Sequence, residues 1–351
     1  MIIESHGNLL DADVEALVNT VNTVGIMGKG VALQFRRAFP TMFKDYERAA
    51  KRGEIRLGQM HVWESDAMAH PKWVINFPTK SHWKARSKLS DIEAGLIDLV
   101  AVVRSRGIRS IALPPLGCGN GGLAWSNVEP LIAQVLAALP EVEVHVYPPE
   151  GAPAAASMVN NAPRPRWTPG KAALVDIIHR YSERALDVSL IEVQKLMYFL
   201  QVAGESLRLE FVKGLYGPYA ENLRHSLKAV EGHFLTGFGD GTQPVMSGSP
   251  ISVLPGVAEE AEKFLAGSSA TNSRIERVLQ LSGGFESAYA LELLSTVHWV
   301  STVDDQRAID DRDLATKLVA NWSGRKKRMF GSDHVSVAWD HLRSTGWLNR
   351  S

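Results

Sequence analysis

The first 150 residues alternate between short apolar runs typical of strands and longer amphipathic segments typical of helices. This alternation predicts an α/β layer fold, with a mixed sheet covered by helices on both faces. Proline at 78 is expected to end the fourth strand, and the serine–glutamate spacing at 90/93 and 126/129 predicts two capping boxes. The expected strands are 1–4, 16–21, 58–63, 73–77, 108–113 and 142–147, and the expected helices are 31–39, 42–52, 90–105 and 126–139.

The pattern changes after residue 150. Residues 151–169 contain four prolines and no periodicity, which indicates a linker between domains 1–150 and 170–351. Helical spacing of apolar residues returns after the linker, whereas strand signals are few. The second domain is therefore predicted to be mostly α-helical, with helices at 172–185, 189–203, 219–230, 257–266, 285–299 and 307–322.

Composition limits the possible functions only modestly. The 351 residues are 45% hydrophobic, enough for two cores, and 38 basic residues balance 38 acidic ones. The single cysteine, Cys118, excludes an internal disulfide and fits a reducing environment. The chain opens without a signal-peptide pattern and has no apolar run of about 18 residues. We therefore expect a cytoplasmic protein without a membrane anchor, and the absence of Cys/His clusters at metal-site spacing argues against a metal.

Residues 18–32 contain a first glycine-rich loop between a strand and a helix. Asn19 and Asn22 precede Gly28, Lys29 and Gly30. Glycine lets a backbone approach a ligand closely, and free N–H groups at a helix N-terminus attract anions. The stretch therefore predicts a diphosphate cradle with two amide side chains beside it.

A second glycine-rich loop, residues 114–123, follows the strand at 108–113. Gly117, Gly119 and Gly122 match the spacing of a dinucleotide fingerprint, but the loop comes last in its domain, so NAD binding is not favoured. Either loop alone could be a simple tight turn. The presence of two such loops in one domain makes that alternative interpretation weaker. Cys118 reads more simply as a small residue at a turn than as a nucleophile.

A basic, aromatic loop, residues 76–88, follows the fourth strand. Its lysines, arginine and Trp83 suit single-stranded nucleic acid, although a solvated surface loop is the alternative. Lys80 lies nearest the strand end, where open α/β sheets carry function. Neighbouring cations (Lys84, Arg86 and Lys29) are expected to lower its pKa and favour a nucleophilic amine.

These motifs together resemble a known family. The segment Val18-Asn19-x-x-Asn22 with Gly28-Lys29-Gly30-Val31-Ala32 resembles the ADP-ribose-binding segment of macrodomains. Asn76-Phe77-Pro78-Thr79-Lys80 and Gly117-Cys118-Gly119 resemble the DarG family, the antitoxins of DarT/DarG systems. The second domain is also similar to that family, at 194–199 and 216–219.

The resemblance implies a three-layer α/β/α macrodomain that removes ADP-ribose from thymidine in single-stranded DNA, without a cofactor. It implies Lys80 and Asn22 as the catalytic residues, with Lys80 attacking C1″ of the distal ribose and Asn22 aiming that ribose at the lysine. It also implies that His82, Trp83 and Lys84 contact DNA. The residues implied for ADP-ribose are Asn8, Leu9, Asn19, Gly28, Lys29, Gly30, Val31, Thr79, Gly117, Cys118, Gly119, Asn120, Gly121 and Gly122.

Two positions depart from the family pattern. Many macrodomains bind the adenine amine through an aspartate, where this chain has Asn8. Relatives with a Lys/Asp pair carry an aspartate in the second loop, where this chain has Gly121. The group that protonates the leaving base is therefore not identified by the resemblance.

Residues 231–320 hold 13 acidic and 6 basic residues, a net charge of 6 − 13 = −7. An acidic surface could imitate DNA phosphates and occupy a toxin's DNA groove, and the resemblance implies such a complex with the toxin DarT. Ordinary solvated helix faces are the alternative. The basic cluster 325–328 instead raises a DNA-binding role for this half.

The sequence thus predicts a two-domain antitoxin: a DNA ADP-ribosyl glycohydrolase releasing ADP-ribose, followed by a toxin-binding domain. One rival is a reader that binds ADP-ribose without hydrolysis and is tethered to a helical adaptor. Another is a macrodomain acting on ADP-ribosylated protein.

Overall fold

The computed structural model describes residues 1–65, 70–243, 245 and 248–349. The chain forms two compact units. The first comprises Met1–Pro163 with Asp240–Thr242, and the second comprises Arg164–Gly239 with Gln243–Ser351. Each unit is described by itself below.

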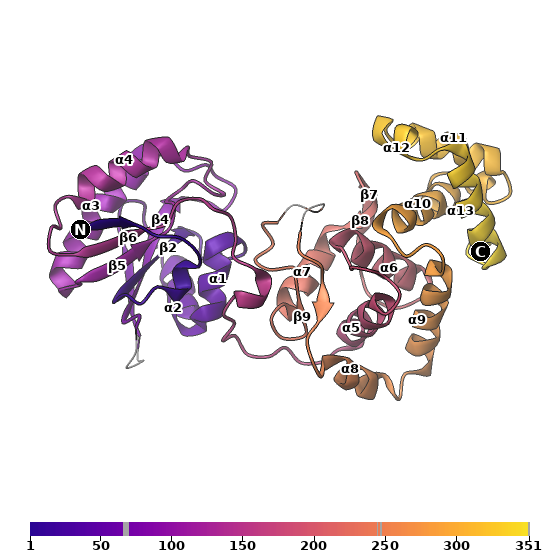
Figure 1. Cartoon of the computed structure of the whole chain (residues 1–351), viewed down its shortest axis with the longest axis horizontal. Helices are drawn as coiled ribbons and strands as arrows, with labels where there is room; N and C mark the ends of the chain where they lie inside the picture. The colour runs from indigo at the N-terminus through magenta and orange to yellow at the C-terminus, as the bar shows by residue number, and fades with distance from the viewer. Residues whose placement is uncertain (66–69, 244, 246–247, 350–351) are drawn as a thin grey trace. The chain divides into compact units, whose positions relative to one another are not determined.

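The first unit is built on a six-stranded sheet with the order β1-β6-β5-β2-β4-β3 (Figure 1). All neighbouring strands are parallel except β3, which runs antiparallel to β4 at one edge. The predicted mixed sheet is therefore confirmed. The strands are β1 Ile2–Glu4, β2 Ala16–Asn22, β3 His61–Glu64, β4 Trp73–Lys80, β5 Ser110–Leu113 and β6 Glu143–Val146.

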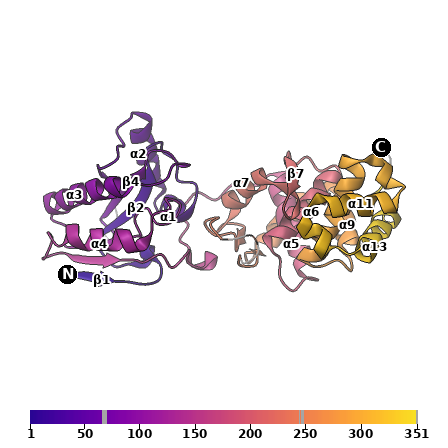
Figure 2. The ribbon, with the colours of Figure 1, turned by 90° about the horizontal axis from the view of Figure 1, so that it is seen from above.

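Helices cover both faces of this sheet (Figure 2). Each face has its own core of buried side chains. Side chains alternate along β2, so Val18 joins the core under α3 and α4, whereas Leu17 joins the core under α1 and α2. The short buried strands thus read as continuous apolar runs because both faces are covered. The helices are α1 Gly30–Ala38, α2 Pro40–Lys51, α3 Leu89–Arg106 and α4 Trp125–Leu136.

The expectation that Pro78 ends the fourth strand is wrong, because β4 continues to Lys80. Strand β3 pairs with β4 only as far as Asn76. At Pro78 the strand has β2 as its one sheet neighbour, so the missing N–H can face the unpaired side. The extension carries Lys80 to the end of the sheet.

Both predicted capping boxes are also wrong. Helix α3 starts at Leu89 and α4 at Trp125, and neither has a side-chain cap, so Ser90 and Ser126 lie inside the first turn. A capping box does occur in the second unit, where Ser189 and Glu192 bond reciprocally at the start of a helix.

The second unit is mainly helical around a single core. Two short antiparallel pairs accompany its helices: β7 Phe211–Gly214 with β8 Gly217–Ala220, and β9 Leu235–Thr236 with β10 Ser252–Val253. The sequence expected a helix from 219, but strand β8 occupies 219–220. The helices are α5 Pro169–Ser182, α6 Leu190–Val202, α7 Glu221–Val230, α8 Val257–Leu265, α9 Ser269–Ser282, α10 Ala288–Trp299, α11 Arg312–Trp322, α12 Gly324–Met329 and α13 Ser332–Ser344.

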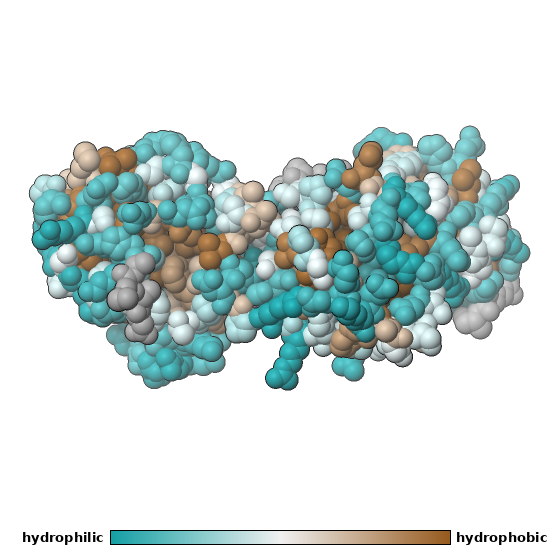
Figure 3. All heavy atoms as spheres, turned by 60° about the horizontal axis from the view of Figure 1, so that its bottom comes forward, coloured by the Kyte–Doolittle hydropathy of each residue, from teal (hydrophilic) through white to brown (hydrophobic). Residues whose placement is uncertain are grey.

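Most of the surface visible in Figure 3 is hydrophilic, with apolar atoms in separated patches. Across the described ranges, no helix combines the length and apolarity that crossing a bilayer requires.

The packing of α3 on the sheet yields a stability test at Gly95. A Cβ there would lie 2.3 Å from Cζ of the Phe77 ring. Gly95→Ala should therefore lower the free energy of unfolding by about 1–3 kcal/mol through overpacking, despite the better helix propensity of alanine. Urea denaturation of the full chain measures this. Ile97→Ala on the same helix is the control, because Ile97 is exposed and should change stability by less than about 0.5 kcal/mol. A more stable Gly95→Ala variant would contradict the described packing.

Candidate active site

Three loops meet at the carboxyl ends of neighbouring parallel strands. Asn22 ends β2 and Lys80 ends β4, and the two residues are register partners. Thr23 fixes the strand ends together, since its N–H donates to the Lys80 carbonyl and its hydroxyl to the Ser81 carbonyl. The second glycine loop follows β5, the other neighbour of β2. This edge is where open α/β sheets place their sites.

The first loop is held by the side chain of Asn22. Its Oδ1 accepts from the N–H groups of Val24 and Ile26, and its Nδ2 donates to the Ile26 carbonyl at 2.6 Å. The hydroxyl of Tyr46, a buried residue of α2, donates to the Asn22 carbonyl at 2.5 Å. Asn22 is 5% exposed. Its amide therefore shapes the loop before any ligand arrives.

The same loop leads into α1. Lys29 is extended and exposed, and no side chain caps the helix. Gly30 opens the helix with φ +63°, where any Cβ would be strained, and a Cβ would lie 3.3 Å from Nδ2 of Asn120. The two glycine loops therefore approach each other at Gly30 and Asn120. Gly28 and Val31 lie close to Gly30 in the chain. An uncapped helix start beside a lysine suits a phosphate.

The second loop is a compact turn. Gly117 has φ +73°, and its carbonyl accepts from Leu123. Gly122 donates to the carbonyl of Gly119. A Cβ on Gly121 would lie 2.3 Å from the Ser87 hydroxyl and 2.4 Å from the Gly117 carbonyl oxygen. No side chain fits at 121 in this conformation, which explains why an aspartate cannot stand there.

Lys80 connects the basic loop to the second glycine loop. Its Nζ donates to the Asn120 carbonyl at 3.0 Å and to the Trp83 carbonyl at 3.2 Å. Burial lowers the pKa of Lys80. The lowered pKa was predicted, but from the nearby cations Lys29, Lys84 and Arg86, and these do not account for it. An amine among uncharged carbonyls, with a depressed pKa, is suited to nucleophilic chemistry.

Cys118 is half-buried, and burial raises the pKa of its thiol to about 11. Its Sγ–H donates to the Leu116 carbonyl at 3.6 Å. A thiol that stays protonated near neutral pH is a poor nucleophile, so Cys118 is interpreted as a structural residue of the turn.

Four other residues implied for ADP-ribose lie at or below the base of the loops. Asn8 caps the 3₁₀ helix Leu9–Asp11 through Oδ1, and its buried Nδ2 has no partner in the described structure. Leu9 is buried under it. Asn19 is fully buried and donates to Asn76, and Thr79 donates to the Val21 carbonyl. Asn19 and Thr79 thus secure the sheet, whereas Asn8 offers a spare donor.

The basic loop exposes His82, Trp83 and Lys84. Trp83 is 47% exposed, with its ring 5.2 Å from the His82 ring and the Lys84 ammonium 4.7 Å from its centroid. Such an aromatic and cationic platform can stack a nucleic-acid base.

His61 is a packed residue of β3. Its ring contacts Asn76 and Asp45, and burial is the main cause that lowers its pKa. Within the described residues, no group of three or more His, Cys, Asp or Glu is placed to hold a metal.

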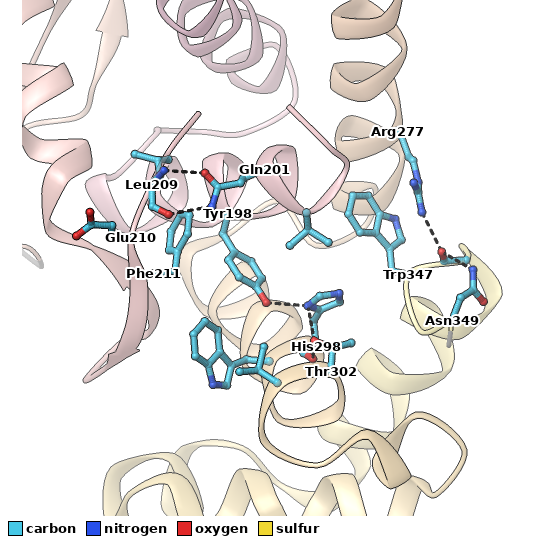
Figure 4. Close-up of a pocket in the computed structure, with 14 residues that line it drawn as sticks. Tyr198, Gln201, Leu209, Glu210, Phe211, Arg277, His298, Thr302, Trp347 and Asn349 are labelled. Atoms are coloured by element: carbon cyan, nitrogen blue, oxygen red, sulfur yellow. Dashed lines mark hydrogen bonds between the residues drawn. The ribbon is translucent and has the colours of Figure 1, made fainter. Parts of the chain in front are cut away.

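The second unit carries an open pocket of about 730 Å³. Figure 4 shows that its polar groups bond to one another and to backbone: Tyr198 to His298, Gln201 to Leu209, and Arg277 to the Gly346 carbonyl. Burial lowers the pKa of His298 to about 4, so the ring is neutral. These polar groups are therefore already engaged within the unit.

Sequence reasoning missed two residues that shape the active site. Tyr46 lies in an amphipathic helix and reads as an ordinary core residue. Ser87 is the one buried side chain of the stretch 81–90, and its role depends on contact with a loop 30 residues later. Neither has a local sequence signal.

The loop geometry makes Asn22→Ala informative. Loss of three side-chain hydrogen bonds to the loop should lower the free energy of unfolding by about 1–3 kcal/mol and weaken ADP-ribose binding about tenfold. Thermal unfolding and calorimetric titration measure the two effects. Asn127→Ala on α4 is the control, because that residue is exposed. Unchanged stability with weakened ADP-ribose binding would contradict this loop-shaping role and show that Asn22 acts on the ligand alone.

The chain is similar to several known proteins. The family model described as Macro domain matches residues 18–132. A DNA ADP-ribosyl glycohydrolase of Mycobacterium tuberculosis is 43% identical over 98% of this chain and 100% of its own length. One of Thermus aquaticus is 46% identical over 98% of this chain and 93% of its length. A Thermosipho africanus transferase–glycohydrolase fusion protein is 35% identical over 41% of each chain. The chain belongs to the DarG family of macrodomain DNA ADP-ribosyl glycohydrolases.

Proposed function

We propose that this enzyme removes ADP-ribose from thymidine bases of single-stranded DNA. The observation that carries the proposal is the Lys80 amine, held on the second glycine loop beside a Trp83 platform. The full-length relatives that are named DNA ADP-ribosyl glycohydrolases support it. The platform gives a reason for a nucleic-acid substrate rather than a modified protein.

The two glycine loops hold the diphosphate in this proposal. Gly28–Val31 supply the start of α1 with Lys29 beside it, and Gly117–Gly122 supply backbone from the other side. Asn8 offers its unpartnered amide donor to the adenine ring. Its Oδ1 already accepts from Leu10, so donation is the capacity that remains.

Lys80 then acts as nucleophile. The amine lone pair forms a bond to C1″ of the distal ribose while the bond from C1″ to the base nitrogen breaks and its electron pair leaves with the base. Gly121 carries no acid, so in this proposal the leaving base takes its proton from solvent. Water subsequently displaces the lysine from C1″ and releases ADP-ribose.

Lys80→Ala should lower turnover of an ADP-ribosylated single-stranded oligonucleotide by at least about a hundredfold, since the nucleophile is lost. A gel assay of the released oligonucleotide measures this. Wild-type turnover should rise with pH through a midpoint below 10.5, because the neutral amine is the active form and burial lowers its pKa. Lys84→Ala is the control and should raise KM with kcat nearly unchanged. Full activity of Lys80→Ala would remove Lys80 as the catalyst, and binding without turnover by the wild type would favour the reader hypothesis.

We also propose that the second unit binds the cognate DNA ADP-ribosyltransferase toxin. The Thermosipho africanus relative joins a transferase and a glycohydrolase in one chain, which supports a functional pairing. Several acids of the proposed surface are paired locally: Asp304 with Lys213, Asp305 with Arg307, and Asp310 with Arg343. Glu259, Glu262, Asp311 and Asp313 remain exposed and carry the acidic character.

The rival DNA-binding role rests on the basic cluster 325–328. Lys326 is fully buried and pairs with Glu292, and Arg325 pairs with the same carboxylate. Only Lys327 and Arg328 of this cluster are exposed. Two of the four basic side chains are thus paired with Glu292 and do not offer free charge to DNA. This favours the acidic surface as the element that recognises the toxin.

Neutralising two exposed acids tests the toxin proposal. Glu259→Gln/Glu262→Gln should slow association with the toxin several-fold at low salt and weaken its salt dependence, because charge complementarity governs on-rate. Glu129→Gln/Glu141→Gln changes the same charge on exposed sites of the first unit and serves as control. Stopped-flow or surface-plasmon measurements give the rates. Equal effects of both pairs would contradict a specific acidic surface.

A further inference from the structure

Ser87 lies where the basic loop meets the second glycine loop. It is 6% exposed, whereas Arg86 and Lys88 on either side are exposed. Its N–H donates to the Gly121 carbonyl at 3.0 Å. Lys80 holds the preceding carbonyl, that of Asn120. Two adjacent carbonyls of the glycine loop are therefore fastened by two residues of one basic loop.

The Ser87 side chain fills the hollow left by two glycines. A Cβ on Gly121 would lie 2.3 Å from the Ser87 hydroxyl, and a Cβ on Gly117 would lie 3.1 Å from the Ser87 Cβ. Glycine at both positions is thus matched to serine at 87. Any shift of the Ser87 side chain shifts the loop that carries the Asn120 carbonyl.

The hydroxyl of Ser87 is buried, yet it has no hydrogen-bond partner in the described structure. A buried hydroxyl that is left unpaired destabilises the folded state relative to a satisfied one. A small apolar residue would fill the hollow without that cost. The hydroxyl is therefore poised to gain a partner in another state of the site.

We propose that Ser87 is a positioning residue for the reaction: its hydroxyl gains a hydrogen bond when a diphosphate binds the second glycine loop, and so keeps the Asn120 carbonyl against the Lys80 amine during the reaction. This proposal rests on the proposed glycohydrolase function. Ser87 acts through Lys80 and does not touch the reacting carbon. Ser87 is expected to affect kcat rather than KM, because the diphosphate is bound by backbone groups of the loops and not by the Ser87 side chain.

Ser87→Ala in the full chain is the principal test. Folding stability should stay the same or rise, because an unpaired hydroxyl is removed, while kcat should fall about three- to tenfold, as loss of one hydrogen bond predicts. KM should change by less than about twofold. The rising limb of the kcat–pH profile should move to higher pH, because a displaced carbonyl lets water reach Lys80 and restores its ordinary pKa.

Two further variants keep the test decisive. Ser87→Cys retains a donor of similar shape and should recover part of kcat. Ser81→Ala removes an exposed hydroxyl from the same loop and should match the wild type. Single-turnover cleavage of an ADP-ribosylated oligonucleotide, with thermal unfolding of each variant, supplies all readouts.

The outcomes separate this proposal from the one it rests on. A wild-type protein without turnover, or a fully active Lys80→Ala variant, overturns the proposed glycohydrolase mechanism. A Ser87→Ala variant with wild-type kcat and pH profile, in a protein whose turnover depends on Lys80, overturns only the role of Ser87. A destabilised Ser87→Ala variant with an unshifted pH profile would show a purely structural role and would equally overturn it.

Discussion

The structure of the active site depends on one contact: an amine held by backbone carbonyls instead of a carboxylate. Lys80 donates to the Asn120 and Trp83 carbonyls in a half-buried setting. A carboxylate partner would favour the charged ammonium far more strongly than uncharged carbonyls do, and burial lowers the pKa of this amine. The contact also requires the second loop to approach the basic loop closely, which glycine at 117 and 121 permits.

The sheet supplies the precision that this contact needs. Strands β2 and β4 run parallel through both cores and end together at Asn22 and Lys80. Because these strands are buried on both faces, their ends are fixed by packing rather than by the loops themselves. The loops then need only local hydrogen bonds, such as the Asn22 amide bonds and the Tyr46 hydroxyl, to hold one conformation.

Much of the first unit could be predicted from the sequence, because apolar periodicity decides which segments become buried strands and helices. The positions of the two glycine loops and of Lys80 after strands could be predicted, because each follows an apolar run that becomes a buried strand. Pro78 and the two capping boxes were misjudged, because tertiary pairing decides where a strand or helix starts and stops. The Ser87 contact and the cause of the Lys80 pKa shift depend on segments distant in sequence. In the second unit, the ion pair between the buried Lys326 and Glu292 could not be predicted, because the two residues are distant in sequence and only the fold brings them together.

The most direct test of this account is a pH titration of the Lys80 amine itself. NMR of the intact chain with isotope-labelled lysine, assigned through Lys80→Arg, would report its titration midpoint. The burial of the amine, with no carboxylate bonded to it in the described structure, predicts a midpoint below the ordinary 10.5. A midpoint at or above 10.5 would contradict the central claim, because the amine would then be no better a nucleophile than a lysine in water.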